Sequence, residues 1–588
     1  MRKHMKLLAL FTALCLLISS LSLNAFSLDK SIESGFRFGA AKGIEVLING
    51  IVGLVNHFVP DGENFYDRAA YRSEGFLPGT AETPANLSVS PCWRLGSAEA
   101  SLVPDDWKTH TYYIGGFISS ANLFTNRVEE LLDDMRVRVI ALDDGTGRGT
   151  AVFATIDSIG LTNKDVRHIR ALLRENMPNT LFSGITVCAT HCHSGIDTEG
   201  LWTQLFRKLP MNLAKSVIGM GDLETGTDPH YMDFLYKTVA CAMQKAVESM
   251  TAGKLSYASK DIGDDYFSVK DRDLWNVRMS QINRFVFTPD DGSVRPTMIV
   301  NIAAHPDVAG LPFDKTDNGR GVSGDYIYYM GQRINDAGYN FMFFNGAIAA
   351  VYMSRGKTNN SQTIDRRVEQ SARYGDALGK MALSLTLTEQ EIADNEFLTD
   401  DEVEAAERAA AEANGGEYFV WYKDWAPVRE VDVPADLKLR FAEVTVPVTN
   451  GIIELAGKLN LASYDVLCED GKYFINTEIG FMELGGAVRV VLLPGEVCQD
   501  LVVGGGSLTA EVSFSKRDFS EKSIYDLFGE NTIAFGLAND AIGYVVPDND
   551  FCLCGVFGHY DELVSLGKHT ASTILRAFAD LAAGIYKE

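Results

Sequence analysis

The sequence predicts an α/β fold, in which a mixed β-sheet carries flanking helices on both faces. Two β-rich runs, 137–142 and 151–156, are separated by a short Asp-Asp-Gly turn. A stretch with helical spacing of its apolar residues begins near Asn163, and a short apolar strand follows at 184–188. Strands that alternate with helices in this way are typical of the α/β class.

The rest of the chain continues this alternation and indicates two lobes. Residues 388–416 are rich in Glu, Asp and Ala and end in Gly-Gly, which is typical of solvated helices or a linker. We therefore expect one domain over 91–588 with a lobe boundary near 388–416. Further strands are expected at 298–303, 341–344, 437–449 and 487–493, and further helices at 326–337 and 560–586.

The N-terminal residues form a targeting segment. Residues 1–25 combine a cationic start, an apolar run and the ending Leu-Asn-Ala, which is the pattern of a secretory signal peptide. An uncleaved membrane anchor is the alternative, because about 17 apolar residues is the lower limit of a membrane span. The protein is therefore expected to be secreted, extracellular or held at the cell surface.

Residues 26–90 form an N-terminal extension with an amphipathic helix. Apolar residues recur there at helical spacing, which predicts one continuous apolar face. This face can pack on the main domain, or it can lie in a membrane interface and give peripheral membrane association. Its residues are Ile44, Leu47, Ile48, Ile51, Val55 and Phe58.

The composition is that of an acidic globular protein. The chain has 78 Asp and Glu residues against 53 Lys and Arg residues, a formal charge of −25. Nucleic-acid binding needs clustered cations, so no nucleic-acid partner is expected. The nine cysteines, one of them within the signal, are scattered and lack zinc-ribbon spacing. Disulfide pairing and oligomeric state stay open.

Three predicted strands end in residues that bind metals. His191 and His193 follow the strand at 184–188, and His305 and Glu496 follow two later strands. Because α/β proteins collect ligands at the carboxyl ends of strands, these side chains are expected to meet, between the two lobes. Imidazole and carboxylate ligands suit zinc, and a catalytic zinc keeps one position open for water. A surface pair of histidines is the alternative for His191 and His193, and which of them is the ligand stays open.

The same motifs carry a family resemblance. The segments ATHCHSG, AAHP, VSGDY, LPGE and GLANDAIGY follow one another in this order across most of the mature chain. In this respect the chain resembles the neutral/alkaline non-lysosomal ceramidase family, as a divergent member. The resemblance implies one zinc ion per chain. The implied zinc ligands are His191, His305, Glu496 and Tyr544, and the implied catalytic residues are His193, beside the metal, and Arg272, which lines the site.

The chain also departs from the family pattern. The catalytic serine of the family falls at Ala349 here, and Ser354 is the nearby hydroxyl that could replace it. With no serine, zinc-bound water would attack directly and His193 would carry the proton. A second tyrosine expected after Tyr544 has no counterpart in 547–554. A C-terminal immunoglobulin-like domain, common in the family, is not expected.

These observations predict a secreted, zinc-dependent hydrolase that cleaves an amide (N-acyl) bond other than a peptide bond. The substrate would be a lipid such as ceramide, which places the protein in sphingolipid metabolism, or another small-molecule amide. An esterase on the same metal site is one alternative. A secreted binding protein that keeps the fold without turnover is another. Metal content separates the enzymes from the binding protein, and a substrate screen separates amides from esters.

Overall fold

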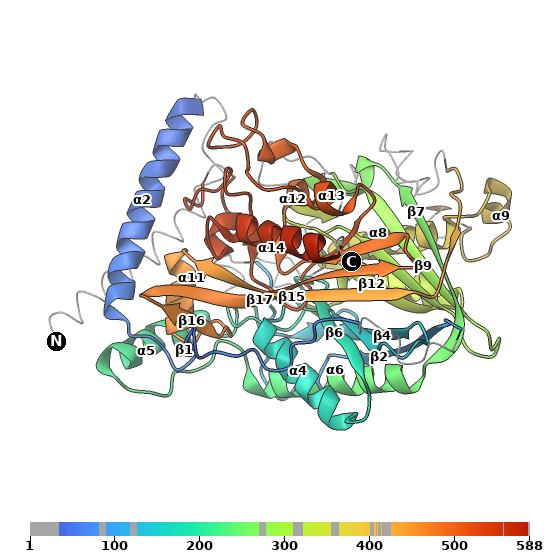
Figure 1. The fold of residues 1–588 in the computed structure, drawn as a ribbon, viewed down its shortest axis with the longest axis horizontal. Helices are drawn as coiled ribbons and strands as arrows, with labels where there is room; N and C mark the ends of the chain where they lie inside the picture. Colours follow the sequence, from blue (N-terminus) through green and yellow to red (C-terminus); the bar gives the residue numbers. More distant parts are fainter. Residues whose placement is uncertain are drawn as a thin grey trace.

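The computed structural model describes residues 34–80, 90–117, 126–269, 278–309, 321–353, 364–399, 425–556 and 558–585, with residues 405, 406, 409 and 413. The predicted signal peptide, Arg272 and Ser354 lie outside these residues. The described chain forms two mixed β-sheets that pack face to face, with helices on the outer faces (Figure 1). The predicted α/β class is confirmed. The two sheets share one core, although the sequence indicates two lobes.

The larger sheet has nine strands among the described residues, in the order β12-β10-β9-β7-β2-β4-β5-β6, with β14 paired to β7. Its β5–β6 and β10–β12 pairs are parallel and the other pairs are antiparallel. The strands are β2 (Trp93–Ser101), β4 (Arg136–Asp143), β5 (Thr150–Ile156), β6 (Phe182–Ala189), β7 (Thr251–Asp261), β9 (Gln281–Pro289), β10 (Thr297–Ile302), β12 (Asn340–Asn345) and β14 (Val431–Val433).

The smaller sheet has six strands in the described chain, in the order β1-β16-β17-β18-β20, with β15 paired to β17. Its first strand comes from the N-terminal extension and pairs in parallel with β16, so the extension is built into this sheet. The strands are β1 (Phe65–Asp67), β15 (Leu437–Val448), β16 (Val466–Glu469), β17 (Lys472–Leu484), β18 (Val488–Leu492) and β20 (Ile533–Phe535).

The two sheets meet in an apolar core. Leu437, Leu439 and Phe441 alternate along β15 and all face the larger sheet, as the two-residue period of a strand requires. Across the interface, the rings of Phe344 and Phe535 stack at 3.9 Å between centroids. Because full burial of each such side chain contributes about 1.5–3 kcal/mol, this core stabilises the packing of the two sheets.

Helices cover the outer faces of this sandwich (Figure 1). α4 and α6 lie on one part of the larger sheet, α7 and α8 on another, and α14 on the smaller sheet. α4 begins at the predicted position, where Thr162 and Asp165 form a capping box. The helices are α4 (Asn163–Asn176), α5 (Leu205–Ile218), α6 (Pro229–Glu248), α7 (Asp325–Asp336), α8 (Ile364–Ser384), α9 (Glu389–Ala393), α11 (Gly451–Lys458), α12 (Gln499–Val503), α13 (Ile524–Phe528) and α14 (Thr570–Ile585).

Short two-stranded ladders complete the sandwich. Two of them, β8–β13 and β19–β21, carry residues of the candidate site described below. The ladders pair β3 (Glu130–Leu131) with β11 (Gly321–Val322), β8 (Phe267–Val269) with β13 (Val351–Met353), and β19 (Glu496–Val497) with β21 (Tyr544–Val545).

The first described helix, α2 (Ser34–Phe58), stands at the side of the molecule (Figure 1). Ile48, Val52 and Val55 are buried against the domain. Leu47 and Phe58, which the sequence places on the same apolar face, are 51% and 49% exposed. Among the described residues, 38–58 of α2 is the one helical stretch that is long and apolar enough to cross a membrane, and most of it is not buried in the protein.

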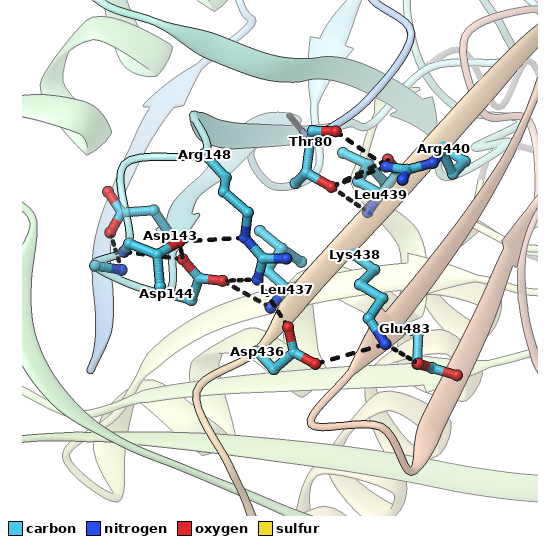
Figure 2. Close-up of polar contacts among 12 residues, drawn as sticks. Thr80, Asp143, Asp144, Arg148, Asp436, Leu437, Lys438, Leu439, Arg440 and Glu483 are labelled. Carbon is cyan, nitrogen blue, oxygen red and sulfur yellow. Dashed lines mark hydrogen bonds and ion pairs between the residues drawn. The ribbon is translucent and has the colours of Figure 1, made fainter. Parts of the chain in front are cut away.

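A polar network fastens the two sheets beside the start of β15 (Figure 2). Arg148, in the turn between β4 and β5, donates to Asp144 and, at 2.7 Å, to Asp436. Asp144 also accepts the backbone N–H of Leu437 at 3.0 Å. Burial alone would raise the pKa of Asp144, but these donors outweigh it and lower that pKa. The network therefore sets the first residue of β15 against the larger sheet.

Candidate metal centre

Three strands of the larger sheet end beside one another, and Asn345 joins their ends. Its Nδ2 donates to the carbonyl oxygens of Thr190 at 2.8 Å and Ala304 at 3.1 Å, and its Oδ1 accepts the N–H of Ala304 at 3.2 Å. Asn345 is the last residue of β12, and Thr190 and Ala304 directly precede His191 and His305. This amide therefore fixes the two histidine-bearing loops relative to each other.

Backbone carbonyls orient the two imidazoles. Nδ1 of His191 donates to the carbonyl oxygen of Ile159 at 2.7 Å, and Nδ1 of His305 donates to that of Val351 at 2.8 Å. Each ring consequently turns its Nε2 inward, the arrangement found when the second nitrogen binds a metal. His191 has a φ of 64°, in the left-handed region, which costs on the order of 1–3 kcal/mol and is characteristic of functional positions.

Glu496 reaches the same point from the other side. Its Oε2 lies 3.1 Å from Nε2 of His191 and 3.1 Å from Nε2 of His305. It directly follows the strand-ending Leu-Pro-Gly turn after β18, and its N–H donates to the carbonyl of Gly543 at 3.0 Å. In the parallel β19–β21 ladder, Glu496 stands opposite Tyr544. The β19–β21 ladder thus supplies two of the predicted ligand residues, and the loops after β6 and β10 of the larger sheet supply the other two.

The electrostatics of the site favour a positive charge at this point. Burial alone would raise the pKa of Glu496, but the imidazoles of His191 and His305 outweigh it and hold that pKa well below its usual range. Burial alone would lower the pKa of His191, but the Glu496 carboxylate raises it. Because both Nδ1 atoms face backbone carbonyls, both Nε2 atoms face the carboxylate of Glu496. A metal cation bound between these three groups would be held by both Nε2 atoms and the carboxylate.

His193 completes a cluster of three imidazoles. Ligand nitrogens of His191, His193 and His305 lie within 4.8 Å of one another, and all three residues are buried. The His193 ring packs on Phe117 with 4.5 Å between centroids, and its backbone N–H donates to the carbonyl of Pro306 at 3.0 Å. This buried cluster could hold a metal ion.

Comparison with solved structures shows which known proteins share this fold. No family model and no curated protein matches the sequence. A neutral ceramidase from Pseudomonas aeruginosa has a similar structure, with a TM-score of 0.52 and 13% identity over 85% of this chain and 75% of that one. A ceramidase complexed with C2 matches with a TM-score of 0.51 and 13% identity, over 85% of this chain and 76% of that one. This chain has the neutral ceramidase fold. The predicted resemblance is therefore confirmed as a shared fold.

Two tyrosines lie at this centre of the ceramidase fold. Tyr544 is buried; burial raises the pKa of its phenol well above the usual value, and the charge of Glu496 adds to the effect. Tyr352, on β13, stacks on His305 with 4.5 Å between ring centroids. The sequence analysis missed Tyr352, which lies three residues after Ala349, the position predicted for the family serine. Residues 547–554 contain no tyrosine, but Tyr352 brings a second phenol to the site from another part of the chain.

The loop at the predicted serine position is apolar. Ala349 is buried, and its N–H donates to the carbonyl of Val497 at 3.3 Å, directly beside Glu496. No hydroxyl or thiol stands at that position. Ser354 and Arg272 lie outside the described residues, so the structure does not place either of them.

Glu199 is the second residue that the sequence analysis missed. It follows the His-x-His motif by six residues, and no metal-ligand spacing singles it out. Burial raises the pKa of its carboxyl to about 8, and the charge of His191 opposes that rise while the charge of Glu496 adds to it. Of the predicted site residues, the structure brings together His191, His193, His305, Glu496 and Tyr544.

Proposed function

We propose that this protein is a secreted, zinc-dependent hydrolase that cleaves an N-acyl amide bond, with a lipid such as ceramide as its substrate. One observation carries the proposal. In a ceramidase fold, the inward Nε2 atoms of His191 and His305 meet the same oxygen of Glu496 at 3.1 Å. Two neutral imidazoles and one carboxylate on a shared point form a donor set that suits zinc.

The residues present fit one zinc ion per chain. His191, His305 and Glu496 would hold it, with Tyr544 as the fourth protein ligand because of its place opposite Glu496. Bound zinc polarises a carbonyl and lowers the pKa of bound water to about 7. The backbone bonds to both Nδ1 atoms keep the imidazoles in the correct tautomer, so little rearrangement is needed on binding.

The surrounding side chains divide the remaining work. His193, beside the two ligand histidines, would carry a proton to the leaving nitrogen. Arg272, by the family resemblance, and Tyr352, by its position on His305, would donate to the developing oxyanion. Because Ala349 offers no nucleophile, the attacking group would be water instead of a protein side chain.

A lipid substrate agrees with two features outside the site. The predicted signal at 1–25 would deliver the chain to the extracellular side, or anchor it there. The outer face of α2 exposes Val46, Leu47 and Leu54, and an apolar helical face of this kind binds the interface of a bilayer. Peripheral association through α2 would keep the enzyme near its substrate.

The first experiment is a metal analysis of the purified mature protein and its His305→Ala variant. We expect about one zinc per chain in the wild type and loss of the metal in the variant. His230→Ala is the matched control, because that imidazole is exposed and lies outside the centre. A protein that retains no metal after purification in zinc would sink the hydrolase proposal.

Two other functions remain as outcomes of a substrate screen. Hydrolysis of short-chain esters without hydrolysis of ceramides would identify an esterase on the same metal site. The second alternative is a binding protein without turnover, and it is favoured by the lack of a nucleophile at Ala349. Tight binding of a short-chain ceramide by the zinc-loaded protein, with no release of fatty acid over days, would identify that outcome.

A further inference from the structure

Two cysteines outside the metal centre are brought together by a tight turn. The N–H of Cys554 donates to the carbonyl of Cys552 at 2.9 Å, which closes a three-residue turn around Leu553. In an extended strand, Cα atoms two residues apart lie about 6.6 Å from each other, near the upper end of the roughly 4.4–6.8 Å that a disulfide spans. The turn draws the two residues closer than a strand would, and their thiols are in hydrogen-bonding contact.

The N-terminal half of α2 covers this pair of thiols. Cys552 and Cys554 are both 0% exposed, and they pack with Ala41 of α2 in one small apolar cluster. The N–H of Leu553, which lies between the two cysteines, donates to Oε1 of Glu45 on α2 at 3.1 Å. The helix is therefore bonded to the turn itself, and a dissolved reagent reaches the thiols only when this part of α2 moves away.

The two thiols differ in their surroundings. Sγ of Cys554 donates to the carbonyl of Val556 at 3.4 Å, and Oε1 of Glu562 accepts the N–H of Cys552 at 3.4 Å. The hydrogen bond from Cys552 and the charge of His559 lower the pKa of the Cys554 thiol, although burial opposes them. The same hydrogen bond, together with burial, raises the pKa of Cys552. Because the thiolate is the form that attacks a disulfide, Cys554 is suited to attack first and Cys552 to attack second.

We propose that Cys552 and Cys554 form a reversible disulfide, and that α2 controls access to it. The oxidant is a disulfide of low molecular weight, RSSR. The thiolate of Cys554 attacks one of its sulfurs, which forms a mixed disulfide and releases RS⁻. Cys552 then gives up its proton and attacks Sγ of Cys554, which forms the bond between the two cysteines and releases a second RS⁻. The protein loses two electrons and two protons, and RSSR becomes two RSH.

The test follows the purified full chain in buffers of reduced and oxidised glutathione. Thiols are blocked with an alkylating reagent after unfolding, and the peptide that carries both cysteines is analysed by mass spectrometry. In the wild type, this peptide should lose two hydrogens in oxidised glutathione and regain them in reduced glutathione. Cys554→Ser should abolish this change. Cys552→Ser should instead keep glutathione on Cys554 as a mixed disulfide, because the second attacking thiol is missing.

Glu45→Ala tests whether α2 controls access to the pair. It removes the acceptor for the N–H of Leu553, so this part of α2 should open more often and the disulfide should form roughly tenfold faster. Glu45→Gln keeps an acceptor oxygen and removes only the charge, so its rate should stay close to that of the wild type. Asn49→Ala is the matched control on an exposed position of the same helix. The exposed Cys241 of α6 should react with glutathione much faster than the covered pair.

The outcomes separate this inference from the proposed function. A peptide that keeps both hydrogens at every glutathione ratio, in the wild type and in Glu45→Ala, overturns the inference and identifies two inert thiols of the core. A second zinc per chain that is lost in Cys554→Ser also overturns it, because the pair would then bind metal. Equal acceleration in Glu45→Gln and Glu45→Ala overturns the control by α2. Cys552→Ser/Cys554→Ser should keep the zinc content of the wild type, so the proposed function stands or falls on its own metal analysis.

Discussion

Asn345→Leu tests how the fold builds the metal centre. Leucine has the same branched side-chain shape as asparagine but no polar atoms, so the carbonyl of Thr190 and the N–H of Ala304 lose the only partner that each has among the described residues. Each buried, unsatisfied backbone group costs about 1–3 kcal/mol, so unfolding should become easier by about 2–6 kcal/mol. That is a large part of the total stability of about 5–15 kcal/mol that is usual for a domain.

Asn345→Leu should also loosen the spacing between His191 and His305. Zinc affinity should fall by about 10–100-fold, the usual effect of removing a group that positions metal ligands. Urea unfolding of the metal-free protein measures the loss of stability. Competition with a chelator, under conditions in which the variant is fully folded, measures the loss of zinc affinity.

Asn212→Leu is the matched control for this prediction. Asn212 is fully buried and bonds the carbonyls of Glu224 and Leu459 at 2.8 Å each, on α5 and outside the metal centre. Its leucine variant should lose comparable stability and keep wild-type zinc affinity. If Asn345→Leu also keeps that affinity, the amide does not position the histidines and the reasoning is refuted.

Three further predictions follow from other contacts. In the metal-free protein, the raised pKa of His191 adds to the free energy of unfolding, fully so below about pH 6.5. This added stability is lost as the pH rises through the folded-state pKa. Glu496→Gln should make the free energy of unfolding, measured in urea, depend less on pH. Arg170 and Glu478 form a buried pair through two hydrogen bonds of 2.7 and 2.8 Å. Arg170→Met should therefore lower the free energy of unfolding by about 3–5 kcal/mol. The double variant Arg170→Met/Glu478→Leu should regain much of that free energy in the same assay. Leu47→Asp on the exposed face of α2 should weaken sedimentation with phosphatidylcholine vesicles about tenfold without lowering thermal stability; equal binding would remove α2 as the membrane contact.

Much of the local structure could be predicted from the chain alone. The strand at 184–188 lies within β6, the strand at 298–303 matches β10 to within one residue at each end, and the helix expected near Asn163 begins at that residue. These elements are encoded by short-range signals, namely runs of apolar residues, turn residues and a capping box. The positions of His191 and His305 at strand ends follow from the same signals.

The face that α2 presents to the domain could not be predicted in the same way. Its apolar residues surround most of the helix, so periodicity cannot say which of them are covered. Packing buries Val52 and leaves Leu47 exposed, because α11 covers one side of the helix and nothing in the described chain covers the other. Amphipathic spacing identifies a helix, and its partner selects the buried face.

The sequence by itself determined the fold class and the chemical types of the candidate ligands, because both are written in local patterns. Only the tertiary structure decided that Glu496 meets both imidazoles on one oxygen, and that Tyr352 stacks on His305. These contacts join loops from different strands and from both sheets. Their geometry depends on how the two sheets pack, and no spacing along the chain records that packing.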